Sequence, residues 1–284
     1  MSIVTRFAPS PTFYLHLGHA ASALIGWRRA RVSGGRFLLR IEDIDRTRCR
    51  PEYTQAIIED LDWLGIDRDG PVRVQSEHMA DYRVTLDALE AMGLLYPCFC
   101  TRSGIAAAMG APHGSDPPYP GTCRHFARSE AAERIERGDA FALRLRMDEA
   151  VRRAGTLRCH EEGEGWIAVD PASLGDVVLA RKDTPASYHL CVTHDDAVQG
   201  VTLVTRGEDL RAATPVHVLL QRLMGWPTPS YAHHPLLADD AGRRLAKRDQ
   251  AASLRDLRAA GMTPEAVRKI VSCRIGPIAS LSGP

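Results

Sequence analysis

Two histidines lie in a short proline-rich segment near the N-terminus, between an expected strand and an expected helix. The segment reads Arg6-Phe-Ala-Pro-Ser-Pro-Thr-Phe-Tyr-Leu-His16-Leu-Gly18-His19. In an open parallel sheet, ligands bind at the carboxyl ends of the strands, where a helix N-terminus offers free N–H groups to phosphate. His16 and His19 are spaced to project from that first turn, and Gly18 lets the backbone approach a ligand. The pattern indicates a phosphate site; a proline-rich turn with two surface histidines is the alternative.

Three cysteines gather in a second segment, from about residue 96 to 124, which is rich in Gly and Pro and has little periodicity. Cys98-Phe-Cys100 and Tyr119-Pro-Gly-Thr-Cys123 place three thiols within 26 residues. Three thiolates in a segment with few core-forming residues suit structural Zn²⁺. By chemistry alone, His125 or His113 would be considered for the fourth ligand, and three reduced cysteines in a small satellite core are the alternative.

The elements around the histidines form a strand–loop–helix–strand pattern. Residues 2–7 read as a buried strand, 20–33 as a helix closed by Gly34–Gly35, and 36–41 as a second strand. This is the βαβ unit of a parallel sheet. The fold class is therefore predicted to be α/β, with a doubly wound parallel sheet split by an insertion.

Further elements follow from periodicity and from helix start and stop signals. Apolar residues share one face in two expected helices. Residues 129–137 suggest a short helix, and Thr214–Pro215 and Thr263–Pro264 each open another, with Thr214 as the N-cap of a helix that Gly225 closes. The helix-face residues are Ile57, Ile58, Leu61 and Leu64, then Tyr82, Leu86 and Leu89; the expected strands are 140–147, 176–181 and 201–206.

Composition limits the function classes. The 284 residues suit one large domain or one domain with an insertion, and 36 basic against 35 acidic residues argue against extended binding to duplex phosphate. A local basic face is still compatible with this balance. No apolar run of about 18 residues predicts a membrane span. The absence of a signal-peptide pattern and seven cysteines, an odd number, favour reduced thiols in the cytoplasm.

The histidine segment resembles the HIGH signature of class I aminoacyl-tRNA synthetases, here written HLGH. The second signature of that family is the lysine-bearing KMSKS loop. Arg244-Leu-Ala-Lys247-Arg248 is similar to it, although Ala246 replaces the usual serine. The two signatures lie in the family's order, about 230 residues apart. The resemblance implies a Rossmann-like catalytic domain with a zinc-bearing insertion and a short helical C-terminal segment.

Other segments are similar to the glutamyl branch of this family. They occur in order from residue 6 to residue 248. These landmarks are Phe-Ala-Pro-Ser-Pro-Thr after Arg6, Arg40-Ile-Glu42-Asp43-Ile-Asp45, Asp62-Trp-Leu-Gly65, Gln75–Ser76 and Arg206-Gly-Glu-Asp-Leu210.

About 36 residues follow Arg248, whereas full glutamyl-tRNA synthetases continue into an anticodon-binding domain. The chain in this respect resembles the glutamyl-queuosine tRNA(Asp) synthetases. These activate glutamate without tRNA and attach it to the queuosine base in the anticodon loop of tRNA(Asp). The implied protein is a cytoplasmic monomer that uses ATP, L-glutamate and this RNA. The implied divisions are residues 1–95 and 186–238 for the two catalytic halves, 96–185 for the insertion, and 239–284 for the loop and tail.

The resemblance also implies roles for single residues. His16, Gly18, His19 and Lys247 hold ATP, which carries Mg²⁺, and the histidines and lysine are catalytic. Arg206, with Arg6 beside it, binds the side-chain carboxylate of glutamate, and Glu42 binds its ammonium. Tyr188 closes the pocket, and Ser10 shapes the turn and contacts the substrate. One Zn²⁺ is held by Cys98, Cys100, Cys123 and Tyr119.

Each role has a plainer alternative. Arg6 and Glu42 would form a salt bridge between adjacent strands, and Tyr188 would be a half-buried core aromatic. Arg36, Arg181 and Lys182 are candidate RNA contacts or merely solvated surface residues. The chain as a whole could be a truncated glutamyl-tRNA synthetase that charges tRNA(Glu), a non-catalytic binding module, or a nucleotidyltransferase that shares the HxGH pattern.

Phe13 departs from the pattern, because the family usually has glycine at this position. A phenylalanine there either stacks near the adenine or crowds the ATP site. We expect Phe13→Gly to keep or raise the affinity for ATP.

Overall fold

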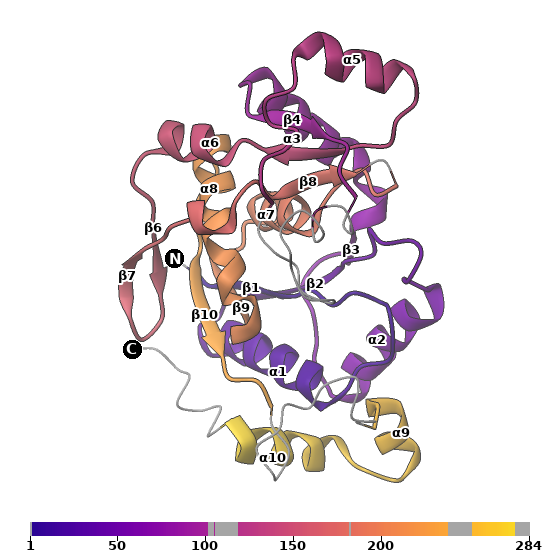
Figure 1. The fold of residues 1–284 in the computed structure, drawn as a ribbon. Helices are drawn as coiled ribbons and strands as arrows, with labels where there is room; N and C mark the ends of the chain where they lie inside the picture. The colour runs from indigo at the N-terminus through magenta and orange to yellow at the C-terminus, as the bar shows by residue number, and fades with distance from the viewer. Residues whose placement is uncertain (1, 102–104, 106–118, 182, 238–251, 276–284) are drawn as a thin grey trace.

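The computed structural model describes residues 2–101, 105, 119–181, 183–237 and 252–275. Figure 1 shows their arrangement. The strands are β1 (Val4–Phe7), β2 (Arg36–Ile41), β3 (Arg73–Val74), β4 (Leu95–Cys98), β5 (Ala142–Leu145), β6 (Arg158–Glu161), β7 (Gly165–Ala168), β8 (Val178–Arg181), β9 (Leu203–Gly207) and β10 (Ser230–His234). The α-helices are α1 (Leu17–Val32), α2 (Pro51–Trp63), α3 (Met79–Ala91), α5 (Arg128–Glu136), α6 (Met147–Ala154), α7 (Tyr188–Val198), α8 (Thr214–Met224), α9 (Leu254–Ala259) and α10 (Pro264–Ile275).

The central sheet is parallel and combines strands from both ends of the chain. β1 pairs with β2 and β2 with β3, all in parallel, while β10 pairs in parallel with β9 and β6. β9 lies beside β1, since the Thr202 N–H donates to the Val4 carbonyl at 3.0 Å. The Val4 N–H in turn donates to Oγ1 of Thr202 at 2.9 Å. The predicted α/β class with a parallel sheet is confirmed.

Helices cover both faces of this sheet (Figure 1). Alternate side chains of β2 show why: Phe37 and Leu39 pack with α1, α2, α9 and α10, whereas Leu38 packs with α3, α6, α7 and α8. Successive residues of a strand point to opposite faces, so an almost continuous apolar strand requires a helical layer on each side. The sheet is thus doubly wound, as the sequence predicts.

The segment from β4 to β8 contributes to two sheets. β4, β5 and β8 form a separate antiparallel sheet at one end of the molecule, next to α5 (Figure 1). β6 and β7 form a hairpin that extends the central sheet beyond β10. Part of the expected insertion therefore packs with the catalytic sheet.

Two helix starts differ from the expected ones. α1 begins at Leu17, three residues before the expected start, because His16 is its N-cap. α8 begins at Thr214 and ends at Gly225 in the left-handed region (φ 68°), as expected, but its N-cap is Ala213 and not Thr214. The Thr214 hydroxyl accepts a hydrogen bond from Arg206 at 2.7 Å and so serves the site rather than the helix. In the part of the chain that the structure describes, no helix is long and apolar enough to cross a membrane.

Candidate active site

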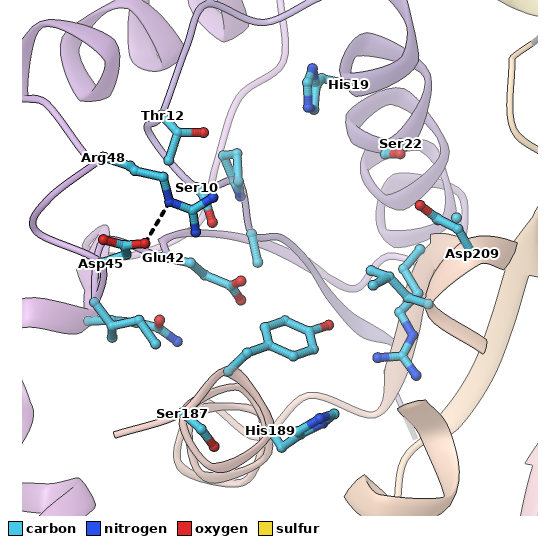
Figure 2. A pocket seen from close by; sticks show the side chains of 18 of the residues that line it. Ser10, Thr12, His19, Ser22, Glu42, Asp45, Arg48, Ser187, His189 and Asp209 are labelled. Carbon is cyan, nitrogen blue, oxygen red and sulfur yellow. Dashed lines mark hydrogen bonds and ion pairs between the residues drawn. The ribbon is translucent and has the colours of Figure 1, made fainter. Parts of the chain in front are cut away.

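A cavity of about 1340 Å³ opens at the carboxyl ends of β1, β2 and β9 (Figure 2). These ends meet there because the three strands run in parallel and adjacent to one another. Lys247 and the rest of its motif lie outside the described residues. All the other residues expected to bind glutamate or ATP line this cavity: Arg6, Ser10, His16, Gly18, His19, Glu42, Tyr188 and Arg206.

The first turn of α1 is capped by the two histidines. Nδ1 of His16 accepts from the Gly18 N–H at 3.0 Å, and Nδ1 of His19 accepts from the His16 N–H at 3.2 Å. Their ring centroids lie 3.9 Å apart. A Cβ on Gly18 would lie 2.9 Å from Cε1 of His16, so an alanine there would displace the capping ring. Gly18 therefore allows the His16 imidazole to pack closely against the backbone. The sequence alone suggests only that Gly18 admits a ligand.

Phe13 extends this pair of rings. It stacks on His16 at 6.2 Å with 15° between the planes, and lies 5.3 Å from His19. Phe13 also lines the cavity. Its ring therefore borders the space in which a nucleotide would meet the histidines.

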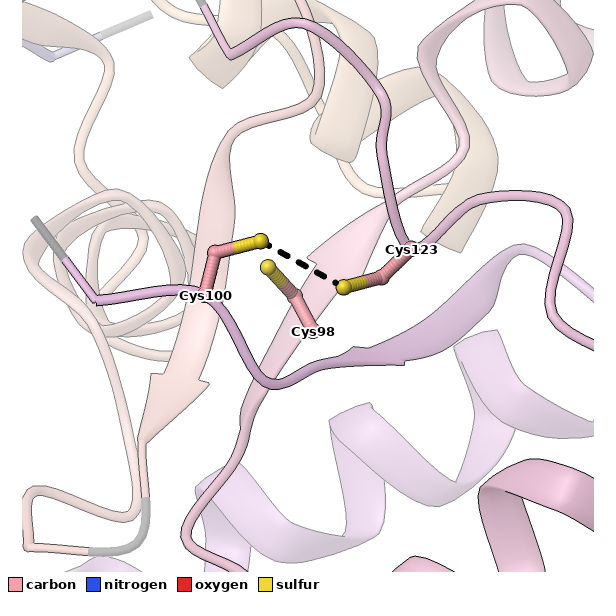
Figure 3. A group of neighbouring side chains, drawn as sticks. All are labelled: Cys98, Cys100 and Cys123. Atoms are coloured by element: carbon pink, nitrogen blue, oxygen red, sulfur yellow. Dashed lines mark hydrogen bonds between the residues drawn. The ribbon is translucent and has the colours of Figure 1, made fainter. Parts of the chain in front are cut away.

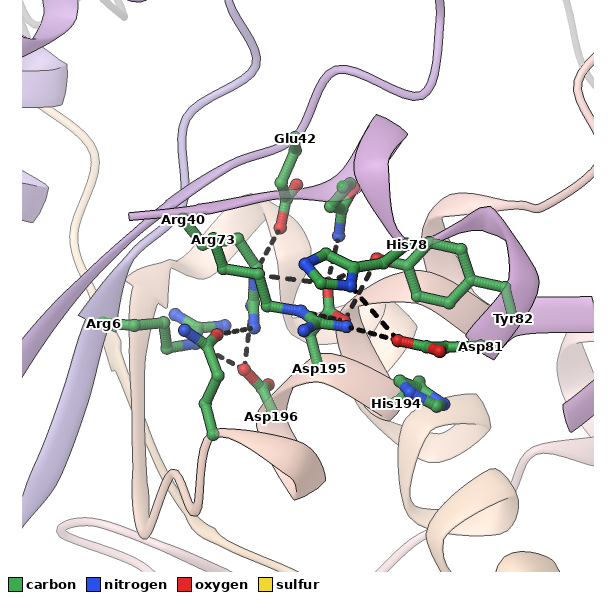
Figure 4. A network of polar contacts seen from close by, with 12 residues as sticks. Arg6, Arg40, Glu42, Arg73, His78, Asp81, Tyr82, His194, Asp195 and Asp196 are labelled. Atoms are coloured by element: carbon green, nitrogen blue, oxygen red, sulfur yellow. Dashed lines mark hydrogen bonds and ion pairs between the residues drawn. The ribbon is translucent and has the colours of Figure 1, made fainter. Parts of the chain in front are cut away.

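Two carboxylates and two arginines beside the cavity belong to a larger network of polar contacts (Figure 4). Asp196 Oδ1 accepts from Arg6 Nε at 2.9 Å and from Arg40 Nη2 at 2.8 Å. Although burial raises the pKa of Asp196, the two arginines hold it below its usual range. Arg40 Nε lies 3.5 Å from Oε1 of Glu42. Arg6 and Glu42 thus have separate partners rather than the direct salt bridge of the plainer alternative.

Of the two carboxylates Asp196 and Glu42, Glu42 is the one that lines the cavity (Figure 2). Burial raises the pKa of its carboxyl to about 7, against the lowering effects of Arg40 and Arg6. An incoming ammonium group would favour the ionised form. The arrangement therefore suits a residue that binds a cationic amine.

Arg206 is 5% exposed, and its hydrogen bonds go to uncharged groups. Nε donates to Nε2 of His233 at 3.1 Å, Nη1 to Nδ1 of His217 at 3.1 Å, and Nη2 to Oγ1 of Thr214 at 2.7 Å. Over the described ranges, no carboxylate forms an ion pair with Arg206. Leaving a buried charge without a counter-ion is costly, so the site is suited to an anionic ligand.

Tyr188 and Ser10 contribute hydroxyl groups to the same cavity. Tyr188 is the first residue of α7, which Ser187 caps by accepting from the Leu190 N–H. Burial raises the pKa of Tyr188, so its hydroxyl stays protonated and can donate. The Ser10 carbonyl accepts from the Thr12 N–H at 2.8 Å, which closes the turn after β1. Tyr188 is thus a cavity residue and not part of the core.

A family model described as tRNA synthetases class I (E and Q), catalytic domain, matches residues 2–280. The chain belongs to this family. A Glutamyl-Q tRNA(Asp) synthetase of Rhodobacter capsulatus is 48% identical over 279 residues, covering 95% of this chain and 99% of that protein. A glutamate–tRNA ligase of Aquifex aeolicus is 40% identical, covering 93% of this chain but 55% of that protein.

A solved glutamate tRNA ligase from Elizabethkingia meningosepticum, in complex with its amino acid, has a TM-score of 0.80 and 27% identity. That comparison covers 99% of this chain and 64% of the other. The expected class I synthetase fold, its ligase class and the resemblance to glutamyl-queuosine tRNA(Asp) synthetases are confirmed.

In this synthetase chain, the three cysteines expected to bind zinc lie together (Figure 3). The Sγ atoms of Cys98, Cys100 and Cys123 all lie within 4.8 Å of one another, and those of Cys100 and Cys123 are 3.5 Å apart. A tetrahedral zinc site with Zn–S bonds of about 2.3 Å has ligands about 3.8 Å apart, so the cluster is compatible with the metal. Oη of Tyr119 lies 3.8 Å from Cys100 Sγ. His125 is exposed and outside the group, and His113 lies outside the described residues.

The candidate RNA contacts divide between two places. Arg181 lines the cavity, whereas Arg36 begins β2 at the end of the strand away from it. Lys182 lies outside the described residues. The geometry therefore favours Arg181 over Arg36 as a residue near the reacting groups.

Several residues of this synthetase site carry no separate sequence signal. The sequence around Arg40 and that around Asp196 give no sign of the contact by which these two residues join β2 to α7. His217 and His233 lie in otherwise ordinary helix and strand patterns, yet both contact Arg206. A buried arginine needs hydrogen-bond acceptors, but which residues supply them depends on the tertiary fold.

Proposed function

We propose that this chain activates L-glutamate with ATP as glutamyl-adenylate, without tRNA, and then transfers the glutamate to the queuosine base in the anticodon of tRNA(Asp). The observation that carries the first part is Arg206, a buried cation at a cavity wall whose partners are neutral. The names of the relatives from Rhodobacter capsulatus and Symbiobacterium thermophilum support the second part.

The two ends of glutamate would meet opposite charges. Its side-chain carboxylate binds Arg206, which still has N–H groups beyond the three that its neutral partners accept. Arg6 adds positive charge nearby while Asp196 holds its side chain in place. The substrate ammonium binds Glu42, and the Tyr188 and Ser10 hydroxyls complete the pocket.

The ATP phosphates would lie at the first turn of α1. There the helix N-terminus, His16 and His19 provide donors, and Gly18 permits the approach. An oxygen of the substrate α-carboxylate attacks the α-phosphorus, and the bond to pyrophosphate breaks. The carboxylate is already ionised, so catalysis consists of positioning and charge stabilisation.

Lys247 is assigned to the developing charge on pyrophosphate, and Mg²⁺ to the ATP complex. Residues on either side of Lys247 in the sequence lie at the site, which supports this assignment. Leu237 lines the cavity, and Ser253 forms a β-bridge with His16.

In the second step, a hydroxyl of the RNA acceptor attacks the acyl carbon and AMP leaves. Arg181 is a candidate contact for the RNA because it lines the cavity. Cys98, Cys100, Cys123 and Tyr119 would hold one structural Zn²⁺ that fixes the conformation around β4. We further propose that the protein acts as a monomer in the cytoplasm.

The first test is exchange of labelled pyrophosphate into ATP with glutamate, aspartate or glutamine, in the absence of RNA. Exchange with glutamate alone is expected. Charging assays with queuosine-containing tRNA(Asp), queuosine-free tRNA(Asp) and tRNA(Glu) then identify the acceptor. Transfer to tRNA(Glu) would favour a truncated glutamyl-tRNA synthetase, and no exchange even with each tRNA added would indicate a binding module.

A further inference from the structure

A chain of hydrogen bonds runs from Arg206 through the imidazole of His217 to that of His189. Which atom donates in the first bond decides which atom donates in the second. Nη1 of Arg206 is 3.1 Å from Nδ1 of His217, and Nε2 of His217 is 3.2 Å from Nδ1 of His189. His217 lies on α8 and is 3% exposed. His189 lies on α7 and lines the cavity (Figure 2).

The proton positions in this line follow from what each group can do. An arginine only donates, so Nδ1 of His217 accepts. Burial, with Arg206 next, lowers the pKa of His217 well below its usual value, so the ring is neutral and its one proton is on Nε2. That proton is donated to Nδ1 of His189.

The same reasoning applies to His189. Burial and Arg206 lower the pKa of His189 to about 4, so this ring is also neutral at pH 7. Since its Nδ1 accepts, its proton is on Nε2. Within the described part of the chain, Nε2 of His189 has no hydrogen-bond partner, although the residue borders the cavity.

We propose that His189 is a specificity-determining residue that presents Nε2–H as a fixed donor to the side-chain carboxylate of the amino acid. His217 is the positioning residue that transmits the donor-only character of Arg206 and fixes this tautomer. The inference rests on the proposed function, because it assumes glutamate as the substrate.

In the proposed arrangement, the two groups that would meet the side-chain carboxylate, Arg206 and Nε2 of His189, are both donors. The side-chain amide of glutamine would turn an NH₂ group toward one of these donors, leaving buried donors facing each other. An isolated His189 could shift its proton to Nδ1 and accept from that amide. The hydrogen bond from His217 opposes this shift and so excludes glutamine.

The direct test of the relay is ¹⁵N NMR of the protein labelled at histidine. Both rings are expected as neutral Nε2–H tautomers, assigned by comparison with His189→Gln and His217→Asn. An Nδ1–H tautomer or a charged ring at either position in the wild type overturns the proposal. This measurement does not depend on activity or on the variants being active.

The specificity test compares exchange with glutamate and with glutamine. In His217→Asn, the amide oxygen can still accept from Arg206, but no donor reaches His189. The ratio of kcat/KM for glutamate over glutamine is expected to fall roughly 10-fold, the effect of one misdirected hydrogen bond. His189→Gln should lose discrimination similarly, since its amide presents either a donor or an acceptor. His160→Asn, on β6 and outside the cavity lining, is the matched control and should keep the wild-type ratio.

The outcomes separate the two proposals. If the wild type uses glutamate and both variants keep its preference over glutamine, His189 does not determine specificity, and the proposed function stands. If the wild type uses no amino acid, with or without tRNA, the proposed function fails, and the specificity role of His189 fails with it.

Discussion

Nδ1 of His19 accepts the backbone N–H of His16 at 3.2 Å, while Nδ1 of His16 accepts the N–H of Gly18. Two histidines thereby make the reciprocal cap that a serine and a glutamate commonly make at a helix start. A neutral ring that accepts at Nδ1 carries its proton on Nε2. The cap of α1 therefore determines which nitrogen of His16 and of His19 is the donor.

Two substitutions of His16 separate capping from catalysis. Asparagine is a good N-cap but has no donor at the Nε2 position, so His16→Asn should keep stability and lose about 100-fold or more in glutamate-dependent exchange. His16→Ala should lose the same activity and about 1 kcal/mol of stability as well. Thermal unfolding and exchange rates measure the two effects. Full activity in His16→Asn would show that Nε2 takes no part in the reaction.

Glu42 leads to a prediction about pH. Burial raises the pKa of its carboxyl to about 7, and only the ionised form attracts an ammonium group. The KM for glutamate should therefore fall as pH rises through about 7. The pKa of Glu42 in the folded protein lies above its ordinary value of 4.5, so this carboxyl favours the folded state fully below pH 4.5, and that contribution to stability is lost as pH rises to about 7.

The Glu42 prediction is checked by exchange kinetics and thermal unfolding over this pH range. Glu42→Gln is the control: its stability should lack this component of the pH dependence, and its KM for glutamate should be high at every pH. A wild-type KM that stays constant through neutral pH would contradict the assignment of Glu42 to the ammonium.

Phe13→Gly tests the departure from the family pattern. The Phe13 ring stacks on His16, lies tilted against His19 and lines the cavity, so removing it opens space next to both histidines. We expect an equal or lower KM for ATP with adenylate formation retained, measured by exchange at varied ATP. A clear loss of adenylate formation would mean that the stacked ring is needed to hold the histidines.

The cysteine cluster predicts one tightly bound metal ion. Elemental analysis of protein purified without added metal should find about one zinc per chain, and a chelator should lower the Tm. Cys123→Ser should lose the metal, while Cys159→Ser, at a buried cysteine outside the cluster, should retain it. Tyr119→Phe identifies the fourth ligand, because retention of full zinc affinity would exclude the tyrosine.

The sequence predicted the features that local patterns encode. The βαβ unit with Leu38 and its neighbours, the Gly225 end of α8 and the helix opened by Pro264 all follow from periodicity and capping signals. The cluster of Cys98, Cys100 and Cys123 was likewise expected, since cysteine spacing is itself the signal.

Other features depend on contacts between distant segments. The β6–β7 hairpin joins the central sheet through one parallel pair, Tyr231 with Glu161, which no local pattern encodes. The sequence pattern predicts a start for α1 three residues too late, because histidine is an unusual N-cap. The environment of Arg206 was also unpredictable, since its partners His217 and His233 come from α8 and β10.

The pairing of β1 with β9 affects how the protein is made. Val4 contacts Thr202, 198 residues later in the chain, and Arg6 reaches Asp196 across 190 residues. During translation, β1 therefore leaves the ribosome long before β9, its neighbour on one side, has been synthesised. Until then, one edge of β1 is exposed to aggregation, and chains with such distant contacts fold slowly. The cavity can form only after β9 has been synthesised, so a nascent chain truncated before residue 203 would lack both the edge partner of β1 and Arg206.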